Sequence, residues 1–222
     1  MHKYAIIVAG GTGERMGQHT PKQFLKLAGK PILMHTIEKF YQTYPELKII
    51  LALPENQFDF WEELCFKYRF INIPHEVVAG GKTRFHSVLN ALKLVNEEGI
   101  VAVHDGVRPL VSQDTIVNCF KTAQQHGNAI PVVDVVDSLR YVNKTENKAV
   151  KRACYKIVQT PQCFQSTLLK KAYQQPFLDE FTDDASVVEA TGEKIHLVQG
   201  NKENIKITSP EDLTVAEAFL IK

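Results

Sequence analysis

The stretch YAIIVAGGTGERM, residues 4–16, decides the fold of this chain. The apolar run from Tyr4 to Ala9 is typical of a strand buried inside a parallel sheet, where both faces of the strand are covered. Gly10, Gly11 and Gly13 follow at once, and their backbone amides can close around a phosphate chain. A buried first strand that runs into such a loop indicates an α/β protein, whose ligands bind at the carboxyl ends of the strands.

The rest of the chain continues this alternation of strands and helices. Further strands are expected at 48–53, 76–78, 100–104 and 129–133, and helices at 32–44, 58–68, 84–95 and 114–126. This order predicts a mostly parallel sheet with helices on both faces. The last third adds a helix at 183–190, short strands at 195–198 and 205–207, and a final helix that Ser209 and Pro210 begin.

One segment interrupts the alternation. Residues 136–142 and 149–153 flank the polar turn 143–148 and read as a β-hairpin inserted after the fifth strand. Because an isolated hairpin is marginally stable in water, it needs a surface to pack on. A second subunit and the body of the same domain are both possible surfaces. We favour a single domain, residues 1–222, in which 136–153 form a dimerisation arm.

Composition excludes several classes of protein. The 26 basic and 25 acidic residues give a net charge of +1, which argues against binding to nucleic acid or to a membrane surface. The four cysteines form no Cys-x-x-Cys pair, as is typical of reduced thiols in the cytosol. The apolar run at the N-terminus is too short for a signal peptide, and we expect a cytoplasmic protein.

The glycine loop is followed by cations. Its spacing fits neither the dinucleotide fingerprint nor the Walker loop. Instead, Arg15 lies within the loop and Lys22 follows it in the segment Pro21-Lys22-Gln23. Backbone amides together with two cations suit a triphosphate, whereas the alternative is a tight turn with surface cations. The combination of strand, loop and cations favours the triphosphate.

A second glycine pair lies between a strand and a helix, at the same predicted edge of the sheet. In the segment AGGKTRFHSV, residues 79–88, Gly80 and Gly81 allow the backbone to approach a planar ring, and Ser87 offers a hydroxyl group. A helix start with an incidental serine is an equally good interpretation.

The segment HDGVRP, residues 104–109, ends the fourth strand. Asp105 is at the carboxyl end of a central strand, where an acidic side chain can contact a sugar hydroxyl or a phosphate-bound magnesium ion. Arg108 can donate two parallel hydrogen bonds to a phosphate. The alternative is an ion pair between Asp105 and Arg108 that shapes the turn.

Two later segments carry weaker signals. In FTDDAS, residues 181–186, Thr182 or Asp183 caps a helix whose N-terminus favours anions, although capping alone also explains them. In NIKIT, residues 204–208, Lys206 is either a ligand group or a solvated lysine. The chain has no Gly-x-Ser-x-Gly or His-Glu-x-x-His motif, so no covalent nucleophile is indicated.

Taken together, these segments resemble the 2-C-methyl-D-erythritol 4-phosphate cytidylyltransferases of the non-mevalonate isoprenoid pathway. The resemblance covers nearly the whole chain and rests on PKQF (21–24), HDGVRP (104–109), QTPQ (159–162), TDDAS (182–186) and NIKIT (204–208). It implies a Rossmann-like fold with a projecting arm that builds a homodimer. It also implies transfer of a cytidylyl group from CTP to a small polyol phosphate, with Mg²⁺ held mainly by the CTP phosphates.

The resemblance further implies roles for individual residues, with no protein metal ligand among them. The residues expected to bind CTP are Ala9, Gly10, Gly11, Thr12, Gly13, Gly80, Gly81, Ser87, Asp105 and Gly106. Those expected to bind the acceptor are Asp105, Arg108, Ser138, Arg152, Thr182 and Lys206, and the arm is expected to donate Arg152 across the dimer. The groups expected to act in catalysis are Arg15, Lys22, Arg152 and Lys206.

The chain departs from the family pattern at Ser138, where threonine is usual, and at Lys82, where an acid can occur. The Ala-Gly-Gly loop is shared with the ribitol 5-phosphate cytidylyltransferases, which are the alternative enzyme, but residues 137–140 and 182–186 look closer to the isoprenoid enzyme. A regulatory module that binds nucleotides without turnover is the non-enzyme alternative. A nicotinamide-dependent enzyme is disfavoured by the glycine spacing.

Overall fold

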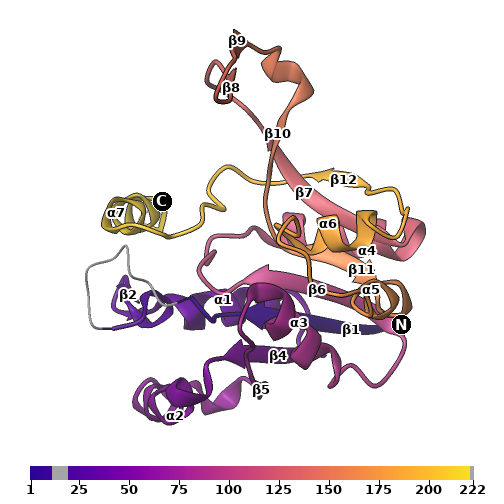
Figure 1. Ribbon diagram of the computed structural model, residues 1–222. Helices are drawn as coiled ribbons and strands as arrows, with labels where there is room; N and C mark the ends of the chain where they lie inside the picture. The colour runs from indigo at the N-terminus through magenta and orange to yellow at the C-terminus, as the bar shows by residue number, and fades with distance from the viewer. Residues whose placement is uncertain (12–19, 221–222) are drawn as a thin grey trace.

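A twisted central sheet forms the middle of the computed structural model, which describes residues 1–11 and 20–220 (Figure 1). The strands are β1 (His2–Val8), β4 (Lys48–Leu53), β5 (Glu76–Ala79), β6 (Gly99–Asp105), β7 (Asn128–Asp134), β10 (Lys156–Val158), β11 (Gln162–Gln165) and β12 (Leu197–Gln199). β1 is parallel to β4 and β6, β4 to β5, and β7 to β12. β10 and β11 run antiparallel to their neighbours. The predicted mostly parallel sheet is therefore confirmed.

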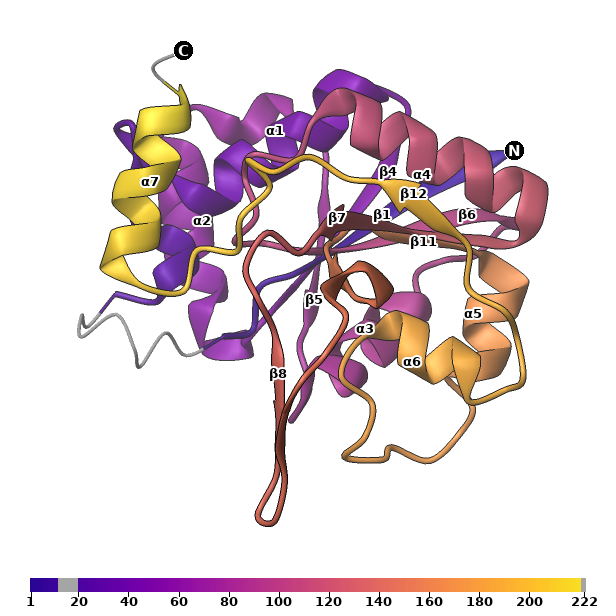
Figure 2. The same ribbon diagram turned by 90° about the horizontal axis from the view of Figure 1, so that it is seen from above.

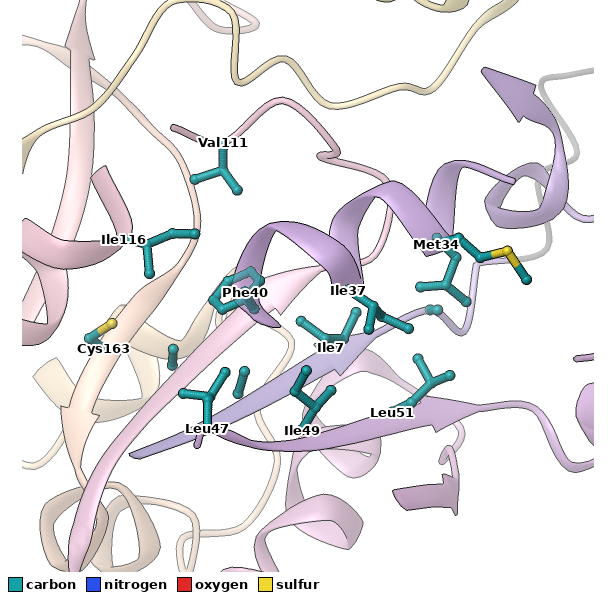
Figure 3. Packing of buried hydrophobic residues seen from close by; sticks show 14 of the residues in the cluster. Ile7, Met34, Ile37, Phe40, Leu47, Ile49, Leu51, Val111, Ile116 and Cys163 are labelled. Atoms are coloured by element: carbon teal, nitrogen blue, oxygen red, sulfur yellow. The ribbon is translucent and has the colours of Figure 1, made fainter. Parts of the chain in front are cut away.

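Helices cover both faces of this sheet (Figure 2). One face carries α1 (Ile32–Thr43), α2 (Phe58–Lys67) and α4 (Gln113–His126), and the other carries α3 (Arg84–Leu92), α5 (Ser166–Ala172) and α6 (Asp184–Glu189). Alternate residues of β1 serve the two faces, because successive side chains of a strand point in opposite directions. Ile7 packs under Ile37 and Phe40 of α1 (Figure 3), whereas Tyr4 and Ile6 belong to the cluster on the other face.

A third apolar cluster packs the C-terminal helix α7 (Pro210–Leu220) against β2 (Lys26–Leu27), a short strand that pairs with β3 (Lys30–Pro31). Ile207 is fully buried in this cluster and donates a backbone hydrogen bond to Val107. The strand expected at 205–207 is wrong. Among the described residues this is the one backbone hydrogen bond from 205–207 to a neighbouring segment, and the amide of Ile205 donates instead to the nearby carbonyl oxygen of Glu203. The burial of Ile207 nevertheless places Lys206 beside the loop that follows β6.

The predicted hairpin is present and projects from the body (Figures 1 and 2). β8 (Arg140–Val142) pairs antiparallel with β9 (Asn147–Ala149). The second strand thus begins inside the segment expected to be turn, and the ladder ends well before residue 153. Large apolar side chains along this arm are exposed, among them Val136, Tyr141 and Val142.

Several elements are not indicated by the sequence pattern. The region 156–172 forms β10, β11 and α5, and single 3-10 turns occur at η2 (Lys22–Phe24), η3 (Glu55–Gln57), η4 (Phe70–Asn72) and η5 (Arg152–Cys154). Gln159, between β10 and β11, and Gln162, the first residue of β11, are polar yet buried, because both side chains make hydrogen bonds to residues far away in the sequence. No helix in the described ranges has the length and apolar character needed to cross a bilayer.

Candidate functional site

Three of the predicted segments meet at one edge of the sheet. Val8 at the end of β1 is in register with Asp105 of β6 and with Ala52 of β4, and Leu53 is in register with Ala79 of β5. Because these strands are parallel, the loops that follow β1, β5 and β6 lie side by side. The predicted common edge for the glycine loop, the second glycine pair and Asp105 is confirmed.

These loops enclose a first cavity of about 240 Å³. The predicted residues that line it are Ala9, Gly10, Gly11, Lys22, Gly81, Ser87, Asp105 and Lys206. Gln23, Lys82, Thr83 and Arg84 also line it, although no role was predicted for them. Thr12, Gly13 and Arg15 lie outside the described residues.

Gln23 joins the end of β1 to the segment that carries Lys22. Its side chain is fully buried, and its Nε2 donates to the carbonyl oxygen of Ala9 and to Oε1 of Gln57, both at 2.8 Å. The side chain of Lys22 consequently lies against the backbone of Gly11, where an added Cβ atom would be 3.0 Å from Lys22 Cε. Gln23 thereby sets where the lysine enters the cavity.

Ser87 and the second glycine pair form one compact turn at the start of α3. The Ser87 hydroxyl accepts a hydrogen bond from the amide of Gly81 and donates one to the carbonyl oxygen of Thr83, both at 3.0 Å. A Cβ atom on Gly81 would lie 2.3 Å from Cβ of His86, so no larger residue fits without a backbone shift. Gly80 does not line the cavity, but it packs closely on Ser87 Oγ. Ser87 is therefore not incidental, since it fixes the shape of this turn.

A second cavity of about 200 Å³ opens beside the first. The predicted acceptor residues Asp105, Arg108, Thr182 and Lys206 all line it, together with Gln159, Thr160 and Gln162. Arg84, Asp105 and Lys206 line both cavities. The two cavities therefore share a wall that carries two cations and one carboxylate.

Asp105 is clamped by cations on both of its oxygens. Its Oδ2 lies 3.1 Å from Arg108 Nε and 3.1 Å from Lys206 Nζ, and its Oδ1 lies 3.5 Å from Arg84 Nε. Burial alone would raise the pKa of Asp105, but Arg84, Lys206 and Arg108 outweigh it and hold the pKa well below its usual range. The ion pair with Arg108 that the sequence left as an alternative is thus present within the cavity wall.

Gly106 lies next to this wall, where the loop after β6 packs on the end of β1. Its amide donates to the carbonyl oxygen of Val8 at 2.9 Å, and its own carbonyl oxygen accepts from the Thr36 hydroxyl at 3.0 Å. An added Cβ atom would be 3.0 Å from Cβ of Ala9. Gly106 lines neither cavity, and its position allows the loop after β6 to lie close to the end of β1.

Arg84 and Asp184 are site residues that the sequence analysis missed. Arg84 Nη2 lies 2.6 Å from Asp184 Oδ2, although 100 residues separate them in the chain. One signal was available, because Arg84 begins α3, where the positive end of the helix dipole disfavours a cation. A basic residue at that position indicates a nearby acid, but the sequence alone does not say which one.

The two predicted residues of the arm do not reach either cavity within one copy of the chain. Ser138 and Arg152 are exposed and line neither cavity, and the Arg152 guanidinium donates to the carbonyl oxygen of Val136 on the same arm. One copy of the chain thus assembles most of the described predicted residues and leaves these two on a projecting hairpin.

Comparison with known proteins agrees with this arrangement. Residues 3–222 match the family of 2-C-methyl-D-erythritol 4-phosphate cytidylyltransferases (IspD). The enzyme of that name from Phocaeicola vulgatus is 53% identical over 220 residues, which are 99% of this chain and all of the relative.

Solved structures give the same result. The 4-diphosphocytidyl-2C-methyl-D-erythritol synthase of Anaerococcus prevotii superposes with a TM-score of 0.85 at 26% identity, covering 100% of this chain and 96% of that one. The 2-C-methyl-D-erythritol 4-phosphate cytidylyltransferase of Thermus thermophilus superposes with a TM-score of 0.78 at 30% identity, covering all of both chains. Similarity over the full length, together with the two joined cavities, places this chain in the family of 2-C-methyl-D-erythritol 4-phosphate cytidylyltransferases.

Proposed function

We propose that this protein transfers a cytidylyl group from CTP to the phosphate of 2-C-methyl-D-erythritol 4-phosphate, giving the CDP-linked product and pyrophosphate. The observation that carries the proposal is the shared wall of Arg84, Asp105 and Lys206 between two cavities. CTP enters the first cavity, beside the glycine loop and Lys22, and the acceptor enters the second. The phosphate of the acceptor then meets the α-phosphate of CTP at the shared wall.

In this reaction the acceptor supplies its own nucleophile. A phosphate monoester is largely a dianion at neutral pH, since its second pKa is about 6, so no general base is needed. The barrier arises from the approach of two anions and from the charge that develops on pyrophosphate. Lys22 in the first cavity and Lys206 in the shared wall offset this charge from fixed positions, and Arg15 is proposed to act with Lys22.

Mg²⁺ is proposed as the metal ion that accompanies CTP, where it would offset the negative charge of the triphosphate. Asp105 is the carboxylate that lines both cavities, and its two oxygens already face Arg84, Arg108 and Lys206. A carboxylate engaged in this way is a poor additional ligand. The donor set therefore fits an ion that is held mainly by the nucleotide.

A homodimer is proposed because of the arm. Val136, Tyr141 and Val142 expose 45–67% of their surfaces there, which is unusual for large apolar residues gathered on one projection. Burying them against a second copy stabilises a hairpin that is marginal alone. The same contact would bring Arg152 and Ser138 to the acceptor cavity of the partner.

The direct test is pyrophosphate release from CTP and Mg²⁺ in the presence of methylerythritol 4-phosphate, ribitol 5-phosphate or no acceptor. We expect rapid release with the first and little with the other two, since full-length family membership does not favour the ribitol alternative. A preference for ribitol 5-phosphate would keep the nucleotide site and overturn the assignment of the acceptor. Tight CTP binding without release for either acceptor would instead indicate a regulatory module.

A further inference from the structure

Asp184 is a fully buried carboxylate that lines neither cavity. It is the first residue of α6, but the capping of that helix is done by Asp183, whose Oδ1 accepts from the amide of Ser186 at 2.9 Å. Both Asp184 oxygens are used elsewhere. Oδ2 lies 2.6 Å from Arg84 Nη2, and Oδ1 accepts from the Tyr173 hydroxyl at 2.6 Å. A buried charge that is not needed for capping requires another explanation.

Arg84 is held between two carboxylates. Its Nη2 contacts Asp184 and its Nε lies 3.5 Å from Asp105 Oδ1, whereas Nη1 has no hydrogen-bond partner among the described residues. Because a guanidinium group is planar and rigid, contacts at Nη2 and Nε fix the orientation of the whole group. Arg84 lines both cavities, so this orientation is fixed at the wall where the two substrates of the proposed reaction meet.

We propose that Asp184 is a positioning residue for cytidylyl transfer, which anchors Arg84 so that its guanidinium contacts phosphate oxygens of both the nucleotide and the acceptor. This proposal rests on the proposed function. A cation fixed in advance at the point where two phosphates approach lowers their repulsion without reorganising during the reaction. Lys206 is less restricted, since 43% of its side chain is exposed compared with 26% for Arg84.

The competing interpretation is that the Arg84–Asp184 pair only stabilises the fold. The two interpretations differ in what a double substitution does. Removing one partner of a buried ion pair leaves an uncompensated charge and destabilises the protein, whereas replacing both with neutral side chains of similar volume restores much of the stability. A structural pair predicts that activity returns together with stability. A positioning role predicts that only stability returns.

The experiment compares Asp184→Asn, Arg84→Met and the double variant, with Tyr173→Phe as the matched control. Tyr173→Phe removes the other hydrogen bond of Asp184 but keeps the ring that stacks on Phe85 at 4.6 Å. Thermal unfolding, kcat and the KM values for CTP and for the acceptor are measured for each protein. We expect lower Tm in both single variants and a recovered Tm in the double variant.

For activity, we expect kcat of the double variant to remain about a hundredfold below wild type, as for loss of one preorganised donor, with both KM values raised. Tyr173→Phe should stay within about twofold of wild type, because Arg84 keeps its anchor. A double variant that recovers both Tm and kcat, or an Asp184→Asn variant with wild-type kinetics, would overturn the proposal.

Titration of CTP and Mg²⁺ by calorimetry separates failure of this proposal from failure of the proposed function. If the wild-type protein releases no pyrophosphate with either acceptor, the proposed transfer is wrong, and the titration still tests Arg84. CTP affinity should then fall in Asp184→Asn and Arg84→Met and be unchanged in Tyr173→Phe. Equal CTP affinity in all of these proteins would overturn the role of Asp184.

Discussion

The hydroxyl oxygen of Thr160 lies 2.9 Å from Nδ1 of His104, and a single placement of hydrogens satisfies both side chains. The carbonyl oxygen of Arg108, 3.1 Å from Nε2, can only accept, so neutral His104 carries its proton on Nε2 and donates it there. Nδ1 then accepts from the Thr160 hydroxyl, whose oxygen also accepts from the amide of Asp105 at 3.2 Å. This series of bonds joins both ends of the turn that presents Asp105 and Arg108.

Thr160→Val should disturb this turn, although the valine side chain has nearly the same shape as that of threonine. The change leaves the Asp105 amide and His104 Nδ1 without partners in a buried region, which costs about 1–3 kcal/mol of unfolding free energy for a buried unsatisfied group. We expect a higher KM for the acceptor, because Arg108 and Asp105 line that cavity. Urea unfolding and steady-state kinetics measure both effects.

Thr160→Ser is the control for this change, since it keeps the hydroxyl group and should behave as wild type in acceptor KM. Unaltered acceptor KM in Thr160→Val would show that the bond to His104 does not hold the turn in place.

Protonation of His104 predicts a specific loss of stability in mild acid. Burial lowers the pKa of His104 to about 4 from its ordinary value of 6.5, so between these values the unfolded chain binds a proton that the folded protein excludes. The contribution is fully present above pH 6.5 and is lost as the pH falls toward 4. At pH 5 it amounts to about 2 kcal/mol relative to pH 7.

His104→Asn removes this titration while its Oδ1 can still accept from Thr160. The measurement is the unfolding free energy in urea at pH 7 and pH 5, in which wild type should lose about 2 kcal/mol more than the variant. His35 and His75 also have lowered pKa values, but they are common to both proteins and cancel in the difference. Asp105 titrates below this window, so it does not contribute. Equal losses in the two proteins would contradict a neutral buried His104.

The sheet and its functional edge were predictable because their signals are local. An uninterrupted apolar strand such as β1 followed by glycines indicates its position without knowledge of the rest of the chain. Once the strands are taken as parallel, Gly10, Gly81 and Asp105 must lie at the same edge, and the register confirms this. The pattern of apolar residues and the positions of the glycines were sufficient to predict this part of the structure.

The Arg84–Asp184 pair and the region 156–172 were not predictable in this way. Their stability comes from bonds between distant segments, such as Gln162 Nε2 to Asp183 at 2.8 Å and Asn204 Nδ2 to the carbonyl oxygen of Thr160 at 2.8 Å. Polar side chains are usually interpreted as loop or surface residues, because a polar side chain that is buried with hydrogen-bond partners leaves no local pattern in the sequence. The prediction of a strand at 205–207 was wrong for a different reason. Ile207 is apolar and buried, but it is covered by helix α7 and is not part of a β-sheet.

Gly81→Ala tests the second glycine pair. The added methyl carbon would meet His86 Cβ at 2.3 Å and the His86 carbonyl carbon at 2.8 Å, so the start of α3 must move. We expect an overpacking cost of about 1–3 kcal/mol and weaker CTP binding by calorimetry, since Gly81 and Ser87 line the nucleotide cavity. Lys93→Ala, at the other end of α3, is the control, because its side chain is exposed and lines neither substrate cavity. Wild-type CTP affinity in Gly81→Ala would count against this turn as part of the nucleotide site.

Lys22→Ala should leave the fold intact and lower kcat about a hundredfold, the usual effect of removing one preorganised donor. The backbone of Lys22 is held independently by its neighbour Gln23, which bonds to Ala9 and Gln57. Circular dichroism and thermal unfolding check the fold, and pyrophosphate release measures turnover. Lys26→Ala serves as the control, because Lys26 is exposed on β2 and lines neither substrate cavity. Wild-type turnover in a folded Lys22→Ala protein would remove Lys22 from the mechanism.

Arg152→Ala should raise the KM for the acceptor far more than the KM for CTP, if the arm of one copy completes the acceptor cavity of its partner. The matched control is Arg140→Ala on β8, an exposed arginine of the same arm that bonds to Asn147 within its own hairpin. Equal effects of Arg152→Ala on both substrates would argue for a general loss of the arm.

Mixed dimers decide whether Arg152 acts across the interface. In a dimer of one Lys22→Ala chain and one Arg152→Ala chain, a site built from Lys22 of one copy and Arg152 of the other carries either both changes or neither. One intact site is thus restored. At an acceptor concentration far below the raised KM of Arg152→Ala, where both parent proteins are nearly inactive, random pairing of equal amounts should recover about a quarter of wild-type activity. If both residues served the same copy, every site would carry one change and mixing would recover nothing. Coexpression followed by measurement of pyrophosphate release distinguishes these outcomes, because neither parent protein can supply the recovered activity by itself.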